Sequence, residues 1–448
     1  MKILLIQPPL WNPAMTPGLI EPLGLETIAA NVNTHEMEIL DMRIDSDLMR
    51  KLDDFKPDIV GITGVAPEYE VVCSVLGDVK KYSSNILTVV GGIFASLAPE
   101  EFKREFVDVI VIGEGEITFP ELVEAYRLKR DFSKVKGIAY REGRQLCFTP
   151  SRERIKNLDD FPLPNRNLTR AHRVLYNRHG RRPVGAIFTT RGCTYKCDFC
   201  TCWKFSNGTF TKRGVESIVN ELMLIDEELV NVEDDNTMLD LNFFEELYKA
   251  IRKAGIKKRF FIYGRSDSIA RRPDIIEKWR EIGLDAILVG LESFRDEDLI
   301  RHNKNNSIAN NENAIHILKQ NGVEIIGYFL IESSFSKEDF DALLNYIKKM
   351  KLTFVVVPFL TPGPGTDLYE KEKHNLITND WQFFDGFHMV VRPTKLSIDE
   401  FLECCTKLLV GIYGNRFVKI KNNLSDKDKV VEKQYQQVLA NYKRHNLK

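Results

Sequence analysis

The chain has 448 residues, of which 43% are hydrophobic and 28% charged, the balance of an ordinary globular protein. Lys and Arg number 63 against 64 Asp and Glu, and this balance argues against a nucleic-acid binder, which would carry a large basic excess. The apolar run at residues 1–6 is stopped by Gln7-Pro8-Pro9 and is too short for a signal peptide or a membrane span. We therefore expect a cytoplasmic protein whose thiols are reduced.

Short apolar strands alternate with helical stretches in the first third of the chain. Strands are expected at residues 3–6, 37–40, 58–63, 86–90 and 107–112, with a helix at 23–32. This alternation predicts a parallel, doubly wound (Rossmann-like) α/β sheet, in which ligands bind beyond the carboxyl ends of the strands. A small hairpin at residues 137–149 is expected to follow.

A second βα series begins near residue 184. Its strands are expected at residues 184–189, 229–233, 259–263, 286–291, 324–330 and 354–360, and its helices at 215–226, 243–254, 273–282, 310–321 and 337–350. Six such units predict a partial (β/α)₆ barrel. The expected organisation is an N-terminal domain (1–145), a Pro-containing linker (146–182), the barrel (183–370) and a small helical cap (371–448). The cap is expected to hold a helix at 397–413 and a surface helix from Asn422.

Four of the eight cysteines fall within ten residues, and three of them, Cys193, Cys197 and Cys200, have the spacing Cys-x3-Cys-x2-Cys. In a reducing compartment such clustering indicates metal or redox chemistry. Three thiolates on one loop can hold a 4Fe-4S cluster, which usually takes four, and leave one iron open for S-adenosylmethionine (SAM). The alternative is a zinc site, but zinc favours two separated cysteine pairs, and the adjacent Cys404-Cys405 would chelate poorly. We interpret Cys202, which breaks the spacing, as a non-ligand that could compete for iron.

The cysteine loop, including the aromatic Phe199 before its last cysteine, resembles the signature of radical SAM enzymes. The resemblance implies cofactor contacts at the carboxyl ends of the next strands. The residues implied, besides Phe199, are Glu233, Asp234 and Asp235 for the SAM amine, Arg265 and Asp267, and Glu292 and Ser293 for the SAM carboxylate or ribose. The alternatives are a solvated turn for the acidic run and a structural, ion-paired arginine for Arg265.

The first domain lacks a Gly-x-Gly-x-x-Gly motif after its first strand, which weakens a dinucleotide interpretation. Its motifs, in their order before the cysteine loop, resemble the cobalamin-binding domain fused to many radical SAM enzymes, and the resemblance extends to about Tyr369. The contacts that it implies are Pro9, Leu23, Thr63, Gly64, Gly91, Gly92, Phe94, Gly113, Glu114 and Gly115. No Asp-x-His-x-x-Gly motif is present, and Phe94 stands where many relatives have His. The resemblance therefore implies weak or absent axial ligation of cobalt, the alternative for Phe94 being plain packing.

Residues 200–208, Cys-Thr-Cys-Trp-Lys-Phe-Ser-Asn-Gly, resemble a stretch of bacteriochlorophyllide and hopanoid C-methyltransferases. This resemblance implies a cobalamin-dependent radical SAM methyltransferase. A 5′-deoxyadenosyl radical would take hydrogen from an unactivated carbon of a lipid or tetrapyrrole, and methylcobalamin would donate the methyl group. The alternatives are a cyclase or carbon–carbon bond-forming enzyme and a non-catalytic iron–sulfur and cobalamin binding module.

Catalytic residues are left unassigned. The partners implied are a hydrophobic small molecule and an electron donor such as ferredoxin or flavodoxin. The lysine-rich tail from Lys419 suggests contact with an anionic membrane, although its interspersed acidic residues favour a solvated helix.

Overall fold

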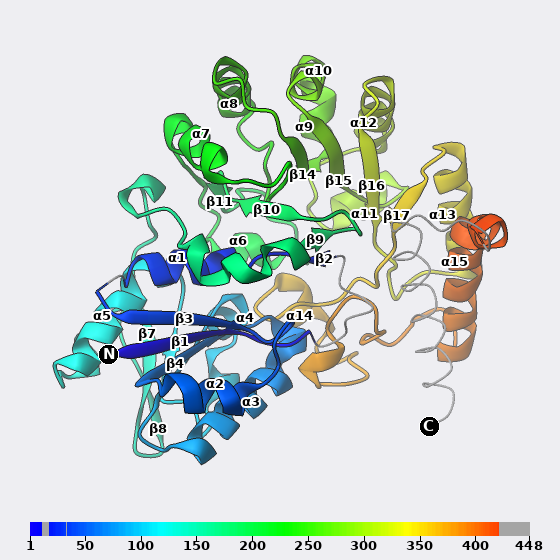
Figure 1. The fold of residues 1–448 in the computed structure, drawn as a ribbon. Coiled ribbons are helices and arrows are strands. Elements are labelled where there is room, and N and C mark those ends of the chain that lie inside the picture. The colour runs from blue at the N-terminus through cyan, green and yellow to red at the C-terminus, as the bar shows by residue number, and fades with distance from the viewer. Residues whose placement is uncertain (11–17, 33, 421–448) are drawn as a thin grey trace. The chain divides into compact units, whose positions relative to one another are not determined.

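The computed structural model describes residues 1–10, 18–32 and 34–420, with backbone only for residues 415–420 (Figure 1). The chain divides into two compact units. Unit 1 comprises Met1–Trp11, Glu21–Val174 and Lys204–Asn207, and unit 2 comprises Asn12–Ile20, Leu175–Trp203 and Gly208–Lys448. The residues expected to form a linker are thus shared between the units: those up to Val174 belong to unit 1 and those from Leu175 to unit 2.

Unit 1 is a seven-stranded sheet in the order β3-β1-β4-β5-β6-β7-β8. Its strands are β1 (Lys2–Gln7), β3 (Glu36–Asp41), β4 (Ile59–Thr63), β5 (Leu87–Gly91), β6 (Val109–Val111), β7 (Ile138–Glu142) and β8 (Gln145–Phe148). The first five in the sheet order are parallel, and the hairpin β7–β8 is antiparallel. Its helices are α1 (Leu23–Ala30), α2 (Leu48–Phe55), α3 (Tyr69–Tyr82), α4 (Ile93–Leu97) and α5 (Gly115–Arg127). The strand order reverses at β1, and in open α/β sheets ligands bind beyond the carboxyl ends of the strands at such a reversal.

Unit 2 contains six parallel strands in sequential order, β10-β13-β14-β15-β16-β17, the partial barrel expected from the sequence. The strands are β10 (Val184–Ile187), β13 (Leu229–Val232), β14 (Arg259–Arg265), β15 (Leu284–Glu292), β16 (Glu324–Phe329) and β17 (Phe354–Val356). Helices α7 (Val215–Leu224), α8 (Leu241–Lys253), α10 (Pro273–Glu281), α12 (Ile308–Gln320) and α13 (Lys337–Lys349) alternate with them. The main core of unit 2 lies between these strands and helices, since outward-facing residues such as Ile262 and Ile287 pack on helix residues such as Phe244 and Ile315.

Short helices and a two-stranded pair follow the carboxyl ends of the barrel strands. They are α6 (Thr201–Phe205), α9 (Ser266–Arg271), α11 (Asp296–Arg301), α14 (Asp367–Glu372) and the two-stranded pair β11 (Thr190–Arg191) with β12 (Thr211–Lys212). A second pair joins β2 (Gly18–Leu19) to β9 (Asn177–Arg178). The C-terminal helix α15 (Ile398–Ile420) packs against α13, for example through Phe401 on Phe340.

The fold class expected from the sequence is confirmed, and the differences concern element ends. The last strand β17 ends at Val356 instead of residue 360, because Pro358 lacks the N–H that a ladder requires. Strand β14 continues to Arg265, which puts that side chain on the strand itself. The helix expected from Asn422 and most of the lysine-rich tail lie outside the described residues.

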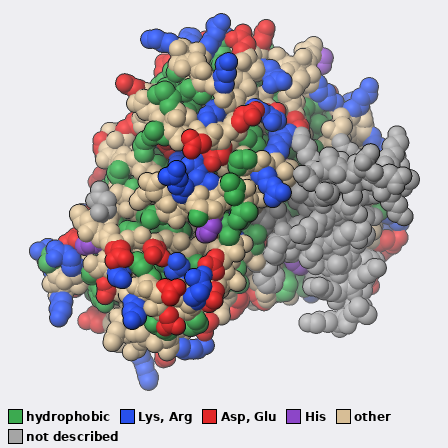
Figure 2. All heavy atoms as spheres, in the orientation of Figure 1, with side chains coloured by type: hydrophobic (Ala, Val, Ile, Leu, Met, Phe, Trp, Pro, Cys, Tyr) green, Lys and Arg blue, Asp and Glu red, His purple; other side chains and the backbone are tan. Residues whose placement is uncertain are grey.

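None of the described helices has the length and apolarity required to cross a bilayer. On the face drawn in Figure 2, basic and acidic side chains are interspersed.

Candidate active site

The cysteine loop follows β10 at the carboxyl end of the barrel, where sites form in this architecture. Burial raises the pKa of both Cys193 and Cys197, and the charge of the nearby Cys200 adds to this in each case, so the three thiols lie near one another. Burial raises the pKa of Cys197 to about 11, whereas a hydrogen bond with Cys202 lowers the pKa of Cys200 to about 7. The loop therefore gathers three partly buried thiols, with Cys202 beside the last of them.

The spacing of the cysteines along the chain separates the two metal interpretations. A zinc ion would draw its ligands onto one centre at about 2.3 Å from each sulfur, and zinc sites favour two separated cysteine pairs. In an iron–sulfur cluster each thiolate binds its own iron. The loop offers three thiols in one stretch, Cys193, Cys197 and Cys200, which fits three corners of such a cluster.

Arg265, at the end of β14, lies against the cysteine loop. Its guanidinium carbon is 3.5 Å from the centre of the Tyr195 ring, and Nη1 is 3.9 Å from the Cys197 sulfur. Its Nε donates to Asp267 at 2.9 Å, and the Tyr195 hydroxyl donates to the same carboxylate at 2.8 Å. Arg265 is thus ion-paired, as the structural alternative expected, and also provides a buried positive charge beside the Cys197 thiol.

The acidic run after β13 divides by environment. Asp234 is fully buried and accepts hydrogen bonds from the backbone and hydroxyl of Thr189 and the backbone of Thr190, at 2.5–2.9 Å. Burial raises the pKa of Asp234 to about 6. Its carboxylate thus holds the start of the cysteine loop, a role that differs from the cofactor contact expected from the sequence. Glu233 and Asp235 are exposed, and Asp235 accepts from the backbone of Gly192 at 2.7 Å.

Buried polar atoms gather beside this run. They are both amide atoms of Asn236 and the hydroxyls of Thr190 and Thr237, all at most 3% exposed, and none has a partner at good hydrogen-bonding geometry. The Asn236 amide lies near the Cys193 thiol and the Thr190 hydroxyl near the Asp234 carboxylate, in contacts that fall short of this geometry. Buried polar groups are nearly always satisfied in folded proteins, so this cluster fits the polar groups of a ligand bound next to the cysteine loop.

At the end of β15, Glu292 has a φ of 62°, an unfavourable conformation for a residue with a side chain. Lys304 donates to its carboxylate at 2.7 Å, and both side chains lie at a bulge where β15 shifts register against β16. The hydroxyl of Ser293 donates to Asp298 at 2.7 Å and so anchors α11. Backbone strain held at a strand end is a feature of ligand-binding positions.

Several neighbours of the loop are absent from the sequence expectations. Three side chains contact the site from positions about 10 to 100 residues away in the chain. The contacts are Tyr195 with Asp267, Lys304 with Glu292, and His302 with Asp198 at 2.9 Å. Phe199, which the sequence placed at the site, packs edge-on against His302 with ring centres 5.9 Å apart. A tyrosine inside the cysteine spacing was the one sequence signal available for these contacts.

Unit 1 presents a different kind of edge at the ends of β4, β5 and β6. Thr63, Gly64, Gly91, Gly92, Gly113, Glu114 and Gly115 are all half-buried there, whereas the strand residues before them are buried. Ser96 ties this edge together by donating to the Gly92 carbonyl at 2.8 Å and accepting from the Gly113 N–H at 2.9 Å. A Cβ on Gly113 would meet nothing within 4 Å, so a large ligand can approach the backbone there. The edge fits a cofactor that is held mainly by backbone.

Other expected cobalamin contacts occupy different positions. Pro9 is half-buried after β1, and Leu23 begins α1 with 7% of its surface exposed. The carboxylate of Glu114 accepts from the backbone of Ile155 at 2.8 Å and pairs with Arg154, so it holds the segment after β8. Phe94 is 2% exposed and packs edge-on against Tyr69 and Phe102. Its ring fills the core, as the packing alternative expected.

Comparison with protein-family models divides the chain in the same way. Residues 14–123 match the B12 binding domain, and residues 187–364 match the radical SAM superfamily. The chain is a cobalamin-dependent radical SAM enzyme. The two matches cover the glycine edge of unit 1 and the cysteine loop of unit 2.

Curated relatives align with most of this radical SAM enzyme. The hopanoid C-3 methylase of Methylococcus capsulatus is 27% identical over 90% of this chain and 78% of its own length. The bacteriochlorophyllide d C-12(1)-methyltransferase of Chlorobaculum tepidum is 26% identical over 93% and 89%. The anaerobic magnesium-protoporphyrin IX monomethyl ester cyclase of Synechocystis is 24% identical over 88% and 82%.

A solved structure shares the whole architecture. The radical SAM methyltransferase TsrM of Kitasatospora setae, solved with cobalamin and a [4Fe-4S] cluster, superposes with a TM-score of 0.70 at 15% identity and covers 99% of both chains. This likeness establishes that the fold of both units is shared.

Proposed function

We propose that the chain is a cobalamin-dependent radical SAM C-methyltransferase that acts on a hydrophobic lipid or tetrapyrrole. The observation that carries the proposal is the cysteine loop. It gathers three thiols beside buried polar atoms that have no partner at hydrogen-bonding geometry, in a chain whose residues 14–123 match a B12 binding domain.

In this proposal Cys193, Cys197 and Cys200 ligate the cluster. Asn236, Thr190 and Thr237 offer their buried polar atoms to SAM, and Glu233, Asp235 and Glu292 provide carboxylates at the same strand ends. When bound, cluster and SAM together supply a radical able to remove hydrogen from carbon, and cobalamin supplies a methyl group.

The remaining protein groups orient and insulate these cofactors. Arg265 and Lys304 place positive charges around the loop, where they oppose the negative charge that thiolates bring. The backbone of Gly91, Gly92 and Gly113 would hold cobalamin at the edge of unit 1, with no axial histidine from Phe94. Exclusion of water would protect a radical formed in the site from side reactions.

The substrate class is proposed from the relatives. A hopanoid and a bacteriochlorophyllide are both hydrophobic, and two methyltransferases acting on them align with this chain nearly end to end. We propose that a ferredoxin or flavodoxin supplies the electron. The related cyclase supports a second candidate, ring closure on a tetrapyrrole.

Anaerobic reconstitution with iron, sulfide and hydroxocobalamin, followed by dithionite and SAM with a deuterated methyl group, tests the proposal. A methyltransferase yields both 5′-deoxyadenosine and S-adenosylhomocysteine, and candidate hopanoids or tetrapyrroles gain deuterated methyl groups. A tetrapyrrole that loses hydrogen and closes a ring, with 5′-deoxyadenosine but no label, would favour the cyclase. Neither nucleoside product from protein with an intact cluster would contradict both enzymatic functions and leave the binding module.

A further inference from the structure

Asp198 stands between two of the cluster cysteines, Cys197 and Cys200, and is fixed by two other segments of unit 2. Its backbone N–H donates to the His302 carbonyl at 3.2 Å, and its carbonyl accepts from the Leu368 N–H at 3.0 Å. Its carboxylate accepts from His302 Nδ1 at 2.9 Å and from Lys371 Nζ at 3.0 Å. The middle of the cysteine loop is therefore held by the residue after α11 and by α14.

His302 lies between two carboxylates. Its Nδ1 contacts Asp198, and its Nε2 lies 3.2 Å from Oε1 of Glu332, the residue that follows β16 by three positions. Nδ1 is hydrogen-bonded, whereas Nε2 makes an ion-pair contact outside hydrogen-bond geometry. A carboxylate beside each ring nitrogen favours the imidazolium. Burial lowers the pKa of His302, but its contacts with the two carboxylates and their charges outweigh burial and raise the pKa to about 9. We refer to Asp198, His302 and Glu332 as the imidazolium bridge.

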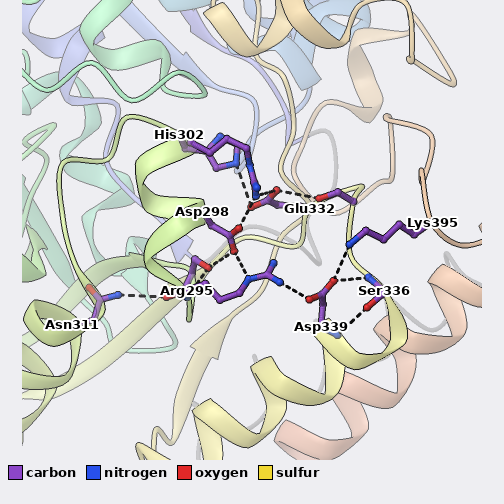
Figure 3. Close-up of polar contacts among 11 residues, drawn as sticks. Arg295, Asp298, His302, Asn311, Glu332, Ser336, Asp339 and Lys395 are labelled. Carbon is purple, nitrogen blue, oxygen red and sulfur yellow. Dashed lines mark hydrogen bonds and ion pairs between the residues drawn. The ribbon is translucent and has the colours of Figure 1, made fainter.

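Figure 3 shows that His302 and Glu332 of this bridge belong to a longer polar chain. Glu332 accepts from Arg301 at 2.6 Å, and Arg301 also donates to Asp298 at 2.7 Å. Asp298 accepts from Arg295, which in turn donates to Asp339 at the first turn of α13. His302 thus links the cysteine loop to the ends of β15 and β16 and to α13.

The two cations on Asp198 differ in exposure. His302 is 8% exposed, whereas the side chain of Lys371 is 59% exposed. A buried charge is weakly screened and acts on its surroundings through a low effective dielectric, while an exposed one contributes little. Of the two cations that contact the Asp198 carboxylate, the His302 imidazolium therefore interacts more strongly with the charge of the cluster.

We propose that His302 is a positioning residue for the iron–sulfur cluster. As the centre of the imidazolium bridge it fixes the segment between Cys197 and Cys200, and its positive charge favours the one-electron-reduced cluster. The inference rests on the cluster of the proposed function. It concerns residues that the cofactor assignments leave unused, and it does not depend on which substrate is methylated.

The test is an anaerobic redox titration of the reconstituted full chain with dithionite, followed by the electron paramagnetic resonance of the reduced cluster. His302→Asn keeps an N–H close to the position of Nδ1 and removes the charge. We expect the equilibrium constant for cluster reduction to fall roughly tenfold, which is about 59 mV for a one-electron couple. Lys371→Gln removes the same formal charge from the same carboxylate, and we expect a smaller shift because Lys371 is exposed.

A His302→Asn cluster with unchanged potential, or with a shift no larger than that of Lys371→Gln, would overturn the inference. If His302→Asn does not retain its iron, the reduction potential of the cluster in Asp198→Asn tests the inference instead. Losing the negative charge while keeping an acceptor for His302 is expected to raise the potential, and an unchanged or lower potential would overturn the inference. Failure of the proposed function is distinguishable, because it would appear in the unmodified chain, either as the absence of both nucleoside products with the cluster intact or as the absence of a four-iron cluster.

Discussion

The carboxyl edges of the two sheets differ in the chemical groups that they present. In unit 1 the edge is mostly glycine and backbone, tied together by the single hydroxyl of Ser96. In unit 2 the edge is crowded with charged side chains that bond to one another, such as Arg265 with Asp267 and Lys304 with Glu292. A backbone edge suits a large cofactor bound over an extended surface, whereas the charged edge suits a small, highly charged centre. The two edges should therefore respond differently to point substitutions.

The largest effect is expected at the cysteine loop. Cys200→Ala removes one of three ligands, and we expect loss of the cluster and a decrease in 5′-deoxyadenosine formation on the order of 10³-fold or more. Iron and sulfide content and the product assay measure this. Cys202→Ala is the matched control, two residues further along the chain on α6, and should retain the cluster. Equal loss of iron in both variants would contradict the assignment of Cys200 over Cys202.

Next in size is Gly92→Ala in unit 1. Gly92 has a φ of 95°, and a Cβ there would lie 2.5 Å from the Thr63 hydroxyl oxygen. We expect a loss of roughly 1–3 kcal/mol in the stability of unit 1 and weaker cobalamin retention. Chemical unfolding and cobalamin absorbance after gel filtration measure the two effects.

Gly143→Ala is the control for Gly92. Gly143 also has positive φ, at 60°, but lies in open space in the β7–β8 turn. It should cost about 1 kcal/mol and leave cobalamin bound. Equal cobalamin loss in both variants would show that stability alone, and not the glycine edge, controls cobalamin binding.

A smaller, pH-dependent effect is expected for Asp234→Asn. The folded chain raises the pKa of Asp234 from 3.8 to about 6, so it holds the proton more tightly than the unfolded chain does. The contribution of Asp234 to the free energy of unfolding is therefore fully present below pH 4. It decreases as the pH rises to about 6 and is constant at higher pH. Asn accepts the same backbone bonds without a charge, and we expect the variant to be more stable at pH 7.5 by on the order of 1–3 kcal/mol.

The difference in thermal midpoint between Asp234→Asn and the unmodified chain, followed from pH 4 to 7.5, measures this. Asp240→Asn is the control with the opposite sign. Although burial raises its pKa, bonds from the first turn of α8 and from Lys212 outweigh it and lower the pKa of Asp240. Its contribution is present at neutral pH and lost in acid. If the thermal midpoint of Asp234→Asn lies below that of the unmodified chain at pH 7.5, the raised pKa of the buried Asp234 carboxylate is contradicted.

The smallest functional effect is expected for Phe94→Leu. Because the ring packs on Tyr69 and Phe102, we expect a stability loss of about 1 kcal/mol and a change in cobalamin affinity of less than about twofold. Equilibrium binding of hydroxocobalamin to the two proteins measures the affinity. A tenfold loss of affinity would mean that the ring itself contacts the corrin.

The architecture was predictable because its signals are local. Short apolar runs and the glycines that follow them located the strands of both main sheets, and the cysteine spacing located the loop. The roles within the acidic run could not be predicted, because these residues follow β13: Glu233 and Asp235 are exposed, whereas Asp234 between them is buried. The partners of Asp198 could not be predicted, since His302 and Lys371 come from elements 104 and 173 positions away. Such contacts depend on how the barrel brings strand ends together.

The most direct test of this account is the metal content of the purified, reconstituted chain, measured together with Mössbauer and visible spectra. The account predicts four irons in one cubane and one cobalt per chain, with the cobalt spectrum lacking histidine ligation. Bound zinc in place of iron, or an intact cluster in a chain that retains no cobalt, would contradict it.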